Sequence, residues 1–346
     1  MLFLLKNEIE NLKKTEHLHG STMMHINRGP FLAHLVPVPP ITTQKCVAQT
    51  IDELFAEIDD GEAALARARS DLATWRKALL KAAVTGELTA DWRAANPPTE
   101  TGAALLARIL ADRRTRWLAD PRNKAKVYVE PAGPDTSNFR VLPEGWTWAS
   151  LGQLCSVITS GSRAWSSYYG RGQGTFIMAQ NVRPGRYDGR FHQPVDPPEG
   201  DVERIRTAVA RDDLLLTIVG ANTGDLCRFD RNPDNHYVCQ SVALLRLQDC
   251  SLASIVEAFF ANDFGKKLQM EEMIYGAGRP HLSFDQIKLL AVPVPPSAER
   301  EQITQALQAI MSEVDAVLTD VPEPETLSAT LRQSILAAAF RGDLVA

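Results

Sequence analysis

The sequence predicts an α+β protein in which one mixed α/β domain is flanked by two long helices that form an antiparallel coiled coil. Three observations support this fold class. Residues 20–90 recur as residues 276–346 at a constant offset of 256, both copies carry the periodicity of a long helix, and the segment between them contains short β-like runs. Because a large unlike segment separates the copies, they indicate internal two-fold pseudosymmetry rather than a repeat array.

The first copy predicts a long helix that follows Pro39 and Pro40 and stops at Gly86. From Val47 onward, apolar residues are spaced alternately four and three apart, on a seam that also includes Trp75. This 3.5-residue period favours a left-handed coiled coil. Proline residues before the helix and a glycine after it are typical of the two ends of a helix. Such a helix would be a rod of roughly 60 Å, long enough to act as a spacer. The interface residues expected from this copy are Val47, Ile51, Leu54, Ile58, Leu65, Leu72 and Leu79.

The second copy predicts a matching helix from about Glu299, interrupted at residues 321–325. Two prolines fall in that stretch, and proline removes a helical donor and clashes with the preceding turn, so we expect a kink or break there. The two helices should pair antiparallel because the intervening domain must carry the chain back. Taken alone, they would also fit a helical hairpin that merely holds the domain together. The interface residues expected from this copy are Ile303, Leu307, Ile310, Val314, Leu331 and Ile335.

The middle of the chain has the pattern of a mixed α/β domain. Residues 175–178, 214–219 and 241–247 are rich in β-branched and aliphatic residues and predict strands. Residues 254–267 predict a helix with Ile255, Phe259 and Phe260 on its apolar face. The preceding segment, 91–141, is polar and proline-rich and predicts a linker that contains one short helix from about Thr101 to Trp117.

Composition and motifs narrow the function classes. A formal net charge of −5 argues against a protein that coats nucleic acid indiscriminately. No apolar run approaches the length of a membrane span, and five cysteines without a CxxC pair predict neither a zinc site nor a disulfide framework, so we expect a cytoplasmic protein without a metal or cofactor. Asn96-Pro97-Pro98-Thr99 resembles the start of an amino-methyltransferase signature, but Thr99 stands where an aromatic ring must stack on a flipped base. No catalytic residue is therefore predicted.

Residues 160–190 carry five arginines against a single aspartate, with aromatic residues interleaved. Arginine with asparagine and glutamine can make bidentate contacts to base edges, while further arginines hold phosphates. The alternative is a solvated arginine-rich loop over an aromatic core cluster. The candidate DNA contacts are Arg163, Trp165, Tyr168, Tyr169, Gln180, Asn181, Arg183 and Arg186, with Asn222, Thr223, Gln240, Arg279, His281 and Ser283 expected nearby.

Several stretches, in the same order along the chain, resemble the specificity (S) subunits of type I restriction-modification systems. The resemblance covers nearly the whole chain. Residues 142–148 (LPEGWTW) resemble the entry to a target-recognition domain of that family, and residues 215–224 (LLTIVGANTG) resemble its central strands. Residues 278–283 (GRPHLS) through 293–296 (PVPP) are similar to its exit into the spacer helix. The resemblance implies a non-catalytic subunit that reads half of a bipartite site on double-stranded DNA and positions methyltransferase (M) and restriction/translocase (R) subunits.

The chain departs from that family pattern at its start, where only about 40 residues precede the first long helix. The expected division is a remnant of a first recognition domain at 1–40, a spacer helix at 41–90, a linker at 91–141, a recognition domain at 142–296 and a second spacer helix at 297–346. Residues 1–5 would then be a remnant helix with little to pack against. Either a truncated gene product or a natural half-size subunit fits this pattern. In the second case, two copies of the chain could restore the missing recognition domain by self-association. The remaining alternatives are a coiled-coil scaffold without DNA binding and a recognition module of a fused restriction-methylation enzyme.

Overall fold

The computed structural model describes residues 2–13, 18–19, 25–26, 28–33, 35, 38–161, 165, 168–271, 273–275, 280–320 and 324–344. The chain forms two compact units, which we call the helical unit (residues 1–74 and 313–346) and the mixed unit (residues 75–312). The boundaries expected from the sequence at 40, 90, 141 and 296 differ from this division, because each compact unit takes part of both long helices.

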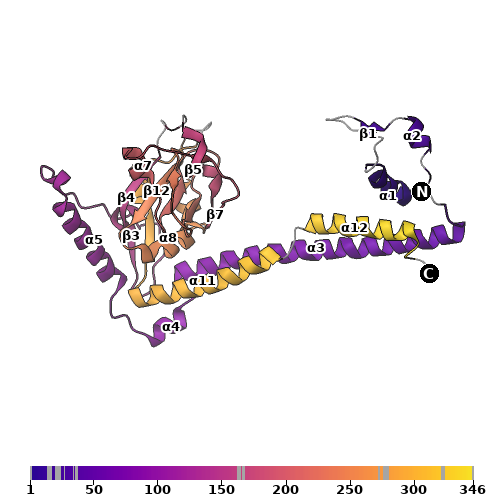
Figure 1. Ribbon diagram of the computed structural model, residues 1–346. Coiled ribbons are helices and arrows are strands. Elements are labelled where there is room, and N and C mark those ends of the chain that lie inside the picture. The colour runs from indigo at the N-terminus through magenta and orange to yellow at the C-terminus, as the bar shows by residue number, and fades with distance from the viewer. Residues whose placement is uncertain are drawn as a thin grey trace. The chain divides into compact units, whose positions relative to one another are not determined.

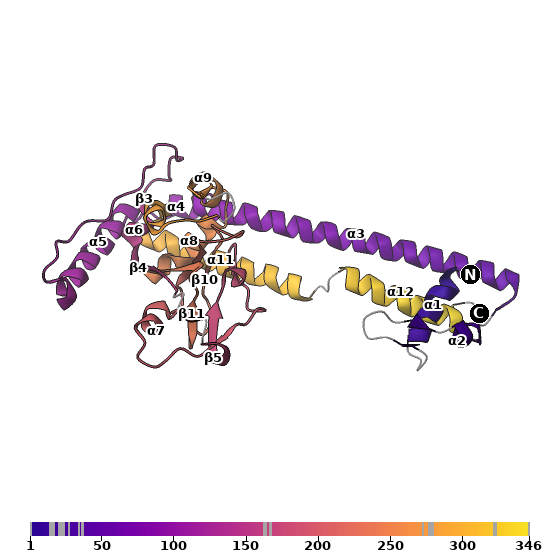
Figure 2. The same ribbon diagram turned by 90° about the horizontal axis from the view of Figure 1, so that it is seen from above.

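The helical unit is built on the beginning of the first long helix and on the last helix of the chain. Figures 1 and 2 show the last helix running antiparallel beside the first, with Arg332 and Asp59 forming an ion pair between them. A small core of Val47, Ile51, Leu336 and Ala339 lies between the two. The elements with residues in this unit are α1 (Leu2–Lys13), β1 (Leu18–His19), β2 (His25–Ile26), α2 (Arg28–Ala33), α3 (Ile41–Thr85), the end of α11 (Ser297–Asp320) and α12 (Pro324–Arg341).

Helix α1 packs onto this core, contrary to the expectation that the first residues would have little to pack against. Leu4 is buried, and the ring of Phe3 meets the edge of Phe55 with ring centroids 5.6 Å apart. Helix α1 also lies against α12. Burial of the apolar side chains of α1 against the α3–α12 pair gains free energy, and the sequence of α1 alone does not reveal this contact.

The mixed unit contains two main β-sheets with a core on both sides of the larger one. The larger sheet has the strand order β10-β9-β12-β4 and is antiparallel throughout, whereas the smaller sheet has the order β11-β5-β8 with β11 and β5 parallel. Two further pairs are β3 with β13 and β6 with β7. The strands are β3 (Thr147–Ser150), β4 (Cys155–Ser160), β5 (Tyr169–Ile177), β6 (Val182–Arg183), β7 (Arg186–Tyr187), β8 (Pro194–Val195), β9 (Leu214–Thr217), β10 (Leu226–Arg228), β11 (His236–Val238), β12 (Val242–Leu247) and β13 (Ala291–Val294).

Short helices connect these strands. The strands predicted at 175–178, 214–219 and 241–247 are confirmed to within one or two residues, except that β5 begins earlier, at Tyr169. The short linker helix is also confirmed as α5, with Thr101 as its N-cap. The helices of this unit besides α3 and α11 are α4 (Ala90–Ala95), α5 (Gly102–Ala119), α6 (Leu151–Leu154), α7 (Val202–Thr207), α8 (Ala253–Phe260), α9 (Lys266–Met270) and α10 (Phe284–Leu289), with 3-10 turns at Pro121–Asn123, Ala179–Asn181 and Cys250–Leu252.

The single helix expected over residues 254–267 is wrong, because it divides into α8 and α9. Asn262 turns its side chain back to cap the end of α8 by donating to the Ala258 carbonyl at 2.8 Å. At Gly265 the chain approaches α8 so closely that a Cβ would lie 2.6 Å from the Phe259 carbonyl oxygen. The turn therefore needs glycine. The apolar pattern of the sequence continues across this turn, so it did not reveal the break.

The long helices end and pair broadly where the heptad pattern places them. Helix α3 ends at Thr85, and Gly86 follows with φ +76°. Within the mixed unit, the end of α3 packs antiparallel to the start of α11, with Leu79, Ile303 and Leu307 buried in one core. The expected break lies between α11, which ends at Asp320, and α12, which begins at Pro324; residues 321–323 lie outside the described residues.

Not every heptad position is buried. Val47, Ile51 and Val314 are buried, whereas Leu54, Ile58, Leu65, Leu72, Ile310 and Ile335 are half-buried. Trp75 is 47% exposed. Leu331 is 44% exposed, yet it lines a hollow between α3 and α12 together with Leu54, Ile58 and Leu65. Beyond the break the buried positions are Ser328, Leu336 and Ala339. Helix α12 is a separate helix, so its buried face does not keep the phase extrapolated from α11. None of the helices described is long and apolar enough to cross a membrane.

Candidate nucleic-acid interface

Trp165 is part of the core of the mixed unit, which corrects its assignment as a DNA contact. Its ring is buried against Phe176 and Tyr237, at centroid distances of 5.8 and 5.5 Å. Its Nε1 donates to Asp201 Oδ2 at 3.3 Å, so the polar edge of the ring is also used. A buried aromatic ring with a satisfied N–H stabilises the fold and cannot stack on a base. At this position the alternative of an aromatic core cluster is correct.

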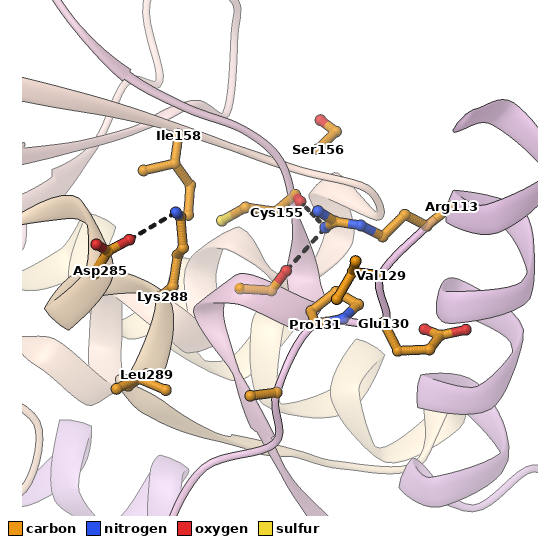
Figure 3. A pocket seen from close by; sticks show the side chains of 12 residues that line it. Arg113, Val129, Glu130, Pro131, Cys155, Ser156, Ile158, Asp285, Lys288 and Leu289 are labelled. Atoms are coloured by element: carbon orange, nitrogen blue, oxygen red, sulfur yellow. Dashed lines mark hydrogen bonds and ion pairs between the residues drawn. The ribbon is translucent and has the colours of Figure 1, made fainter. Parts of the chain in front are cut away.

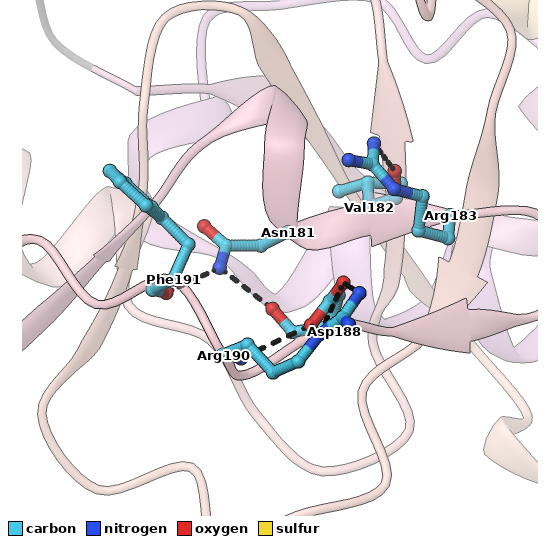
Figure 4. A network of polar contacts seen from close by, with 6 residues as sticks. All are labelled: Asn181, Val182, Arg183, Asp188, Arg190 and Phe191. Atoms are coloured by element: carbon cyan, nitrogen blue, oxygen red, sulfur yellow. Dashed lines mark hydrogen bonds and ion pairs between the residues drawn. The ribbon is translucent and has the colours of Figure 1, made fainter. Parts of the chain in front are cut away.

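Asn181 is likewise a structural residue rather than a reader of base edges. It is fully buried, and its amide donates to the carbonyl oxygens of Asp188 (2.8 Å) and Phe191 (2.7 Å), as Figure 4 shows. Its Oδ1 accepts from the Met178 N–H at 2.9 Å. A side-chain amide offers two donors and one acceptor oxygen, so these bonds leave little capacity for a base. Asn181 instead shapes the loop that follows β7.

The hydroxyl groups of Thr223 and Ser283 also form hydrogen bonds within the protein. Thr223 is buried, and its hydroxyl bonds to the carbonyl oxygen of Gly220 at 2.6 Å. Ser283 is the N-cap of α10, where its Oγ accepts from the Gln286 N–H while the Gln286 side chain bonds back to the Ser283 N–H. This reciprocal capping box satisfies the first turn of the helix. Both residues therefore shape the loops of the site. Their assignment as direct DNA contacts is corrected.

The other candidates remain at least partly accessible. Arg186, Tyr169 and Gln240 are exposed, whereas Tyr168, Gln180, Arg183, Asn222 and His281 are half-buried. The ring of His281 stacks on Tyr275 with centroids 5.4 Å apart. Arg163 and Arg279 lie outside the residues that the structure describes.

The accessible cations gather around the β6–β7 hairpin, in a group of Arg183, Arg186, Arg190 and Arg231 that we call the arginine cluster. Arg183 and Arg186 are directly opposite each other in the hairpin register. The Arg231 guanidinium lies 5.3 Å from the centre of the Tyr187 ring, and it closes over Gly189, where a Cβ would meet Arg231 Nη1 at 2.8 Å. Arg231 was missed in the sequence because it comes from the loop after β10, and only the tertiary structure brings it to the hairpin.

The charge of the arginine cluster is only partly balanced. Arg190 donates to both carboxylate oxygens of Asp188, with its closest nitrogen at 2.6 Å (Figure 4). Arg190, and to a smaller degree Arg186, lower the pKa of the Asp188 carboxyl well below its usual range. Asp188 therefore stays ionised and neutralises one guanidinium. Arg183, Arg186 and Arg231 remain as the positive excess, in the fork geometry that suits phosphates and guanine edges.

The hairpin is held at one edge of the larger sheet. Its turn residue Gly185 has φ +63°, a left-handed conformation that favours glycine, and its N–H donates to the Leu226 carbonyl of β10 at 2.9 Å. Val182 and Tyr187, which are paired in the hairpin, are buried in the core. The arginines thus extend from a hairpin whose other face is anchored in the core, which gives a charged surface a rigid support.

The chain is similar in sequence to specificity subunits of type I restriction enzymes, although no protein-family model matches it. The EcoBI specificity subunit of Escherichia coli is 24% identical over 335 residues, which cover 94% of this chain and 61% of that protein. The StySPI specificity subunit of Salmonella potsdam is 24% identical over 346 residues, covering 99% of this chain and 63% of that protein. The chain therefore spans about three fifths of the length of these curated relatives.

The fold is also similar to solved structures. A chain from a study of complex assembly and conformational transition of the type I R-M system has a TM-score of 0.59 and 17% identity, with 97% of this chain and 68% of that chain covered. The HsdS subunit from Thermoanaerobacter tengcongensis has a TM-score of 0.50 and 19% identity, with 99% and 68% covered. These likenesses confirm the predicted α+β fold class. The sequence comparison confirms the resemblance to type I specificity subunits.

Proposed function

We propose that this chain is a sequence-specific DNA-binding specificity subunit of a type I restriction-modification complex, in which the mixed unit reads one half of a bipartite site. The observation that carries the proposal is the arginine cluster, a rigidly supported positive surface in a chain of net charge −5. Charge concentrated on one hairpin suits local recognition of a duplex better than indiscriminate coating.

In this proposal the chain recognises DNA and does no chemistry. The accessible guanidinium groups of Arg183 and Arg186 contact the duplex, and Arg231 binds the phosphate backbone of the DNA beside them. Gln240 and Asn222 supply the amides that can distinguish adenine. Methylation and cleavage belong to the partner M and R subunits, which the long helices position, and the complex acts in the cytoplasm. A second copy of the chain is a further candidate partner, since two identical recognition domains related by a two-fold axis would bind identical half-sites.

The double variant R183A/R186A should lose sequence-selective DNA binding. Each phosphate contact removed should lower the slope of log affinity against log salt by roughly one unit, and each base contact removed should cost about 1–3 kcal/mol. The measurement is selection of bound duplexes from a randomised pool, sequencing of the bound fraction, and a salt titration of the selected duplex.

The matched control is K77A, which removes one exposed positive charge from α3 within the same unit. It should enrich the same duplexes as the unmodified chain. If the double variant also enriches them with unchanged salt dependence, the arginine cluster is not the reading surface. If the unmodified chain enriches no sequence at any salt concentration, the alternative of a scaffold without DNA binding is correct.

A further inference from the structure

The end of α5 and the turn that follows it form a second basic surface in the mixed unit. Residues 113–126 contain six basic residues and one acidic residue. Arg114, Arg116, Arg122, Lys124 and Lys126 are exposed. Arg122 is matched by Asp120, to which its guanidinium donates hydrogen bonds of 2.7 to 3.0 Å. The nearest carboxylate oxygen of Glu130 is 3.9 Å from Arg114, so most of the remaining charge faces solvent.

An extended segment with exposed aliphatic side chains follows this turn directly. Val127 is 86% exposed and Val129 is 79% exposed, and Leu118 near the end of α5 is 61% exposed. Tyr128 points the other way, with its ring 5.2 Å from Trp117. This alternation is that of a β-strand with one face anchored and one face open. Among the residues described, none hydrogen-bonds to the backbone of Val127, Tyr128 or Val129, so this segment has the free edge of an unpaired strand.

A hollow of about 550 Å³ lies beside this edge. Figure 3 shows Arg113 and Glu130 on one side of it and Asp285, Lys288 and Leu289 on the other. Arg113 holds the base of the hollow by donating to the carbonyl oxygens of Gly152 (2.8 Å) and Cys155. The charges within the hollow balance, and its apolar lining comes from Val129, Pro131, Ala132, Ile158 and Leu289. The hollow therefore suits an aliphatic side chain, while the excess positive charge lies on the exposed residues of α5 and of the turn that precedes Val127.

We propose that this surface docks an extended segment of a partner protein that alternates aliphatic and acidic residues. The segment would pair with the free edge at Val127–Val129, place aliphatic side chains on the valines and in the hollow, and bring carboxylates to Lys124 and Lys126. Exposed aliphatic side chains next to cations distinguish this surface from a phosphate-binding one, because a duplex backbone would neutralise the lysines and leave the valines in water.

The docking surface is separate from the proposed DNA face. In the larger sheet, β10 and β4 are the two edge strands. The β6–β7 hairpin lies against β10, whereas Arg113 of α5 bonds to the first residue of β4. The partner segment and the duplex can therefore be tested independently, and failure of one leaves the other standing.

The test uses the full chain and a fluorescent seven-residue peptide that alternates glutamate and valine, with binding followed by anisotropy. The unmodified chain should bind this peptide, and V127D/V129D should weaken binding at least tenfold by removing apolar contact and adding like charge. K124E/K126E should weaken binding at low salt, with a difference that shrinks as salt rises. V141D is the control, because Val141 is 91% exposed and does not line the hollow, and its affinity should be unchanged.

Three results would overturn the docking proposal. The first is absence of peptide binding by the unmodified chain at millimolar concentration. The second is equal affinity for a peptide in which glutamine replaces glutamate, since charge complementarity would then be irrelevant. The third is that K124E/K126E weakens binding of a random DNA duplex while peptide binding stays unchanged, which would make the surface a phosphate site. All the substituted side chains are exposed, so thermal melts should match the unmodified chain and exclude misfolding.

Discussion

Replacing Glu299 with alanine should lower the free energy of unfolding of the mixed unit by about 3–5 kcal/mol, the usual cost of removing one partner of a buried ion pair. The Glu299 carboxylate is 1% exposed and collects three donors. Its Oε1 accepts from the Thr89 hydroxyl and from Arg93, both at 2.6 Å, and its Oε2 accepts from Trp146 Nε1 at 2.8 Å. Together these bonds join α11, helix α4 with its N-cap Thr89, and the entry to β3.

The alanine variant leaves those three donors without their acceptor, and buried unpaired groups cost more than the bond was worth. Urea denaturation followed by tryptophan fluorescence measures the effect, because Trp146 and the other five tryptophans all belong to the mixed unit. E301A, an exposed change on the same helix, is the control and should shift the transition by less than about 0.5 kcal/mol. A loss below about 1 kcal/mol in E299A would mean that water or a rearranged side chain replaces the carboxylate.

Replacing Ile51 with aspartate should unfold much of the helical unit. Ile51 is 0% exposed and lies at the centre of its small core with Val47, Leu336 and Ala339. An unpaired carboxylate there would be desolvated without a partner, and a core of this size has few other contacts to compensate. We expect a loss of several kcal/mol, as for other buried charges without a partner.

The measurement for I51D combines far-ultraviolet circular dichroism with tryptophan fluorescence. Helical signal should be lost at lower temperature, whereas the fluorescence transition should move less because the helical unit contains no tryptophan. A56D adds the same charge at an exposed position of α3 and is the control. An I51D melt that matches A56D would show that α1 and α12 do not cover Ile51 in solution.

Much of the secondary structure could be predicted because its causes are local. A 3.5-residue apolar period over residues 47–82 predicts a continuous helix wherever the chain lies, and Gly86 ends it because glycine tolerates positive φ. β-branched and aliphatic runs predicted β9 and β12 for a similar reason. The break between α8 and α9 was missed because it depends on how closely Gly265 approaches Phe259 and Phe260, which is a tertiary contact.

The candidate site shows the limit of residue type as a guide. The sequence by itself determined the long helices, the central strands and a local excess of arginine after residue 160. Only the tertiary structure decided that Asn181 is saturated by backbone groups, that Trp165 is core, and that Arg231 joins the hairpin. The physical reason is that periodicity acts over a few residues, whereas the free capacity of a polar side chain depends on which distant groups already bond to it.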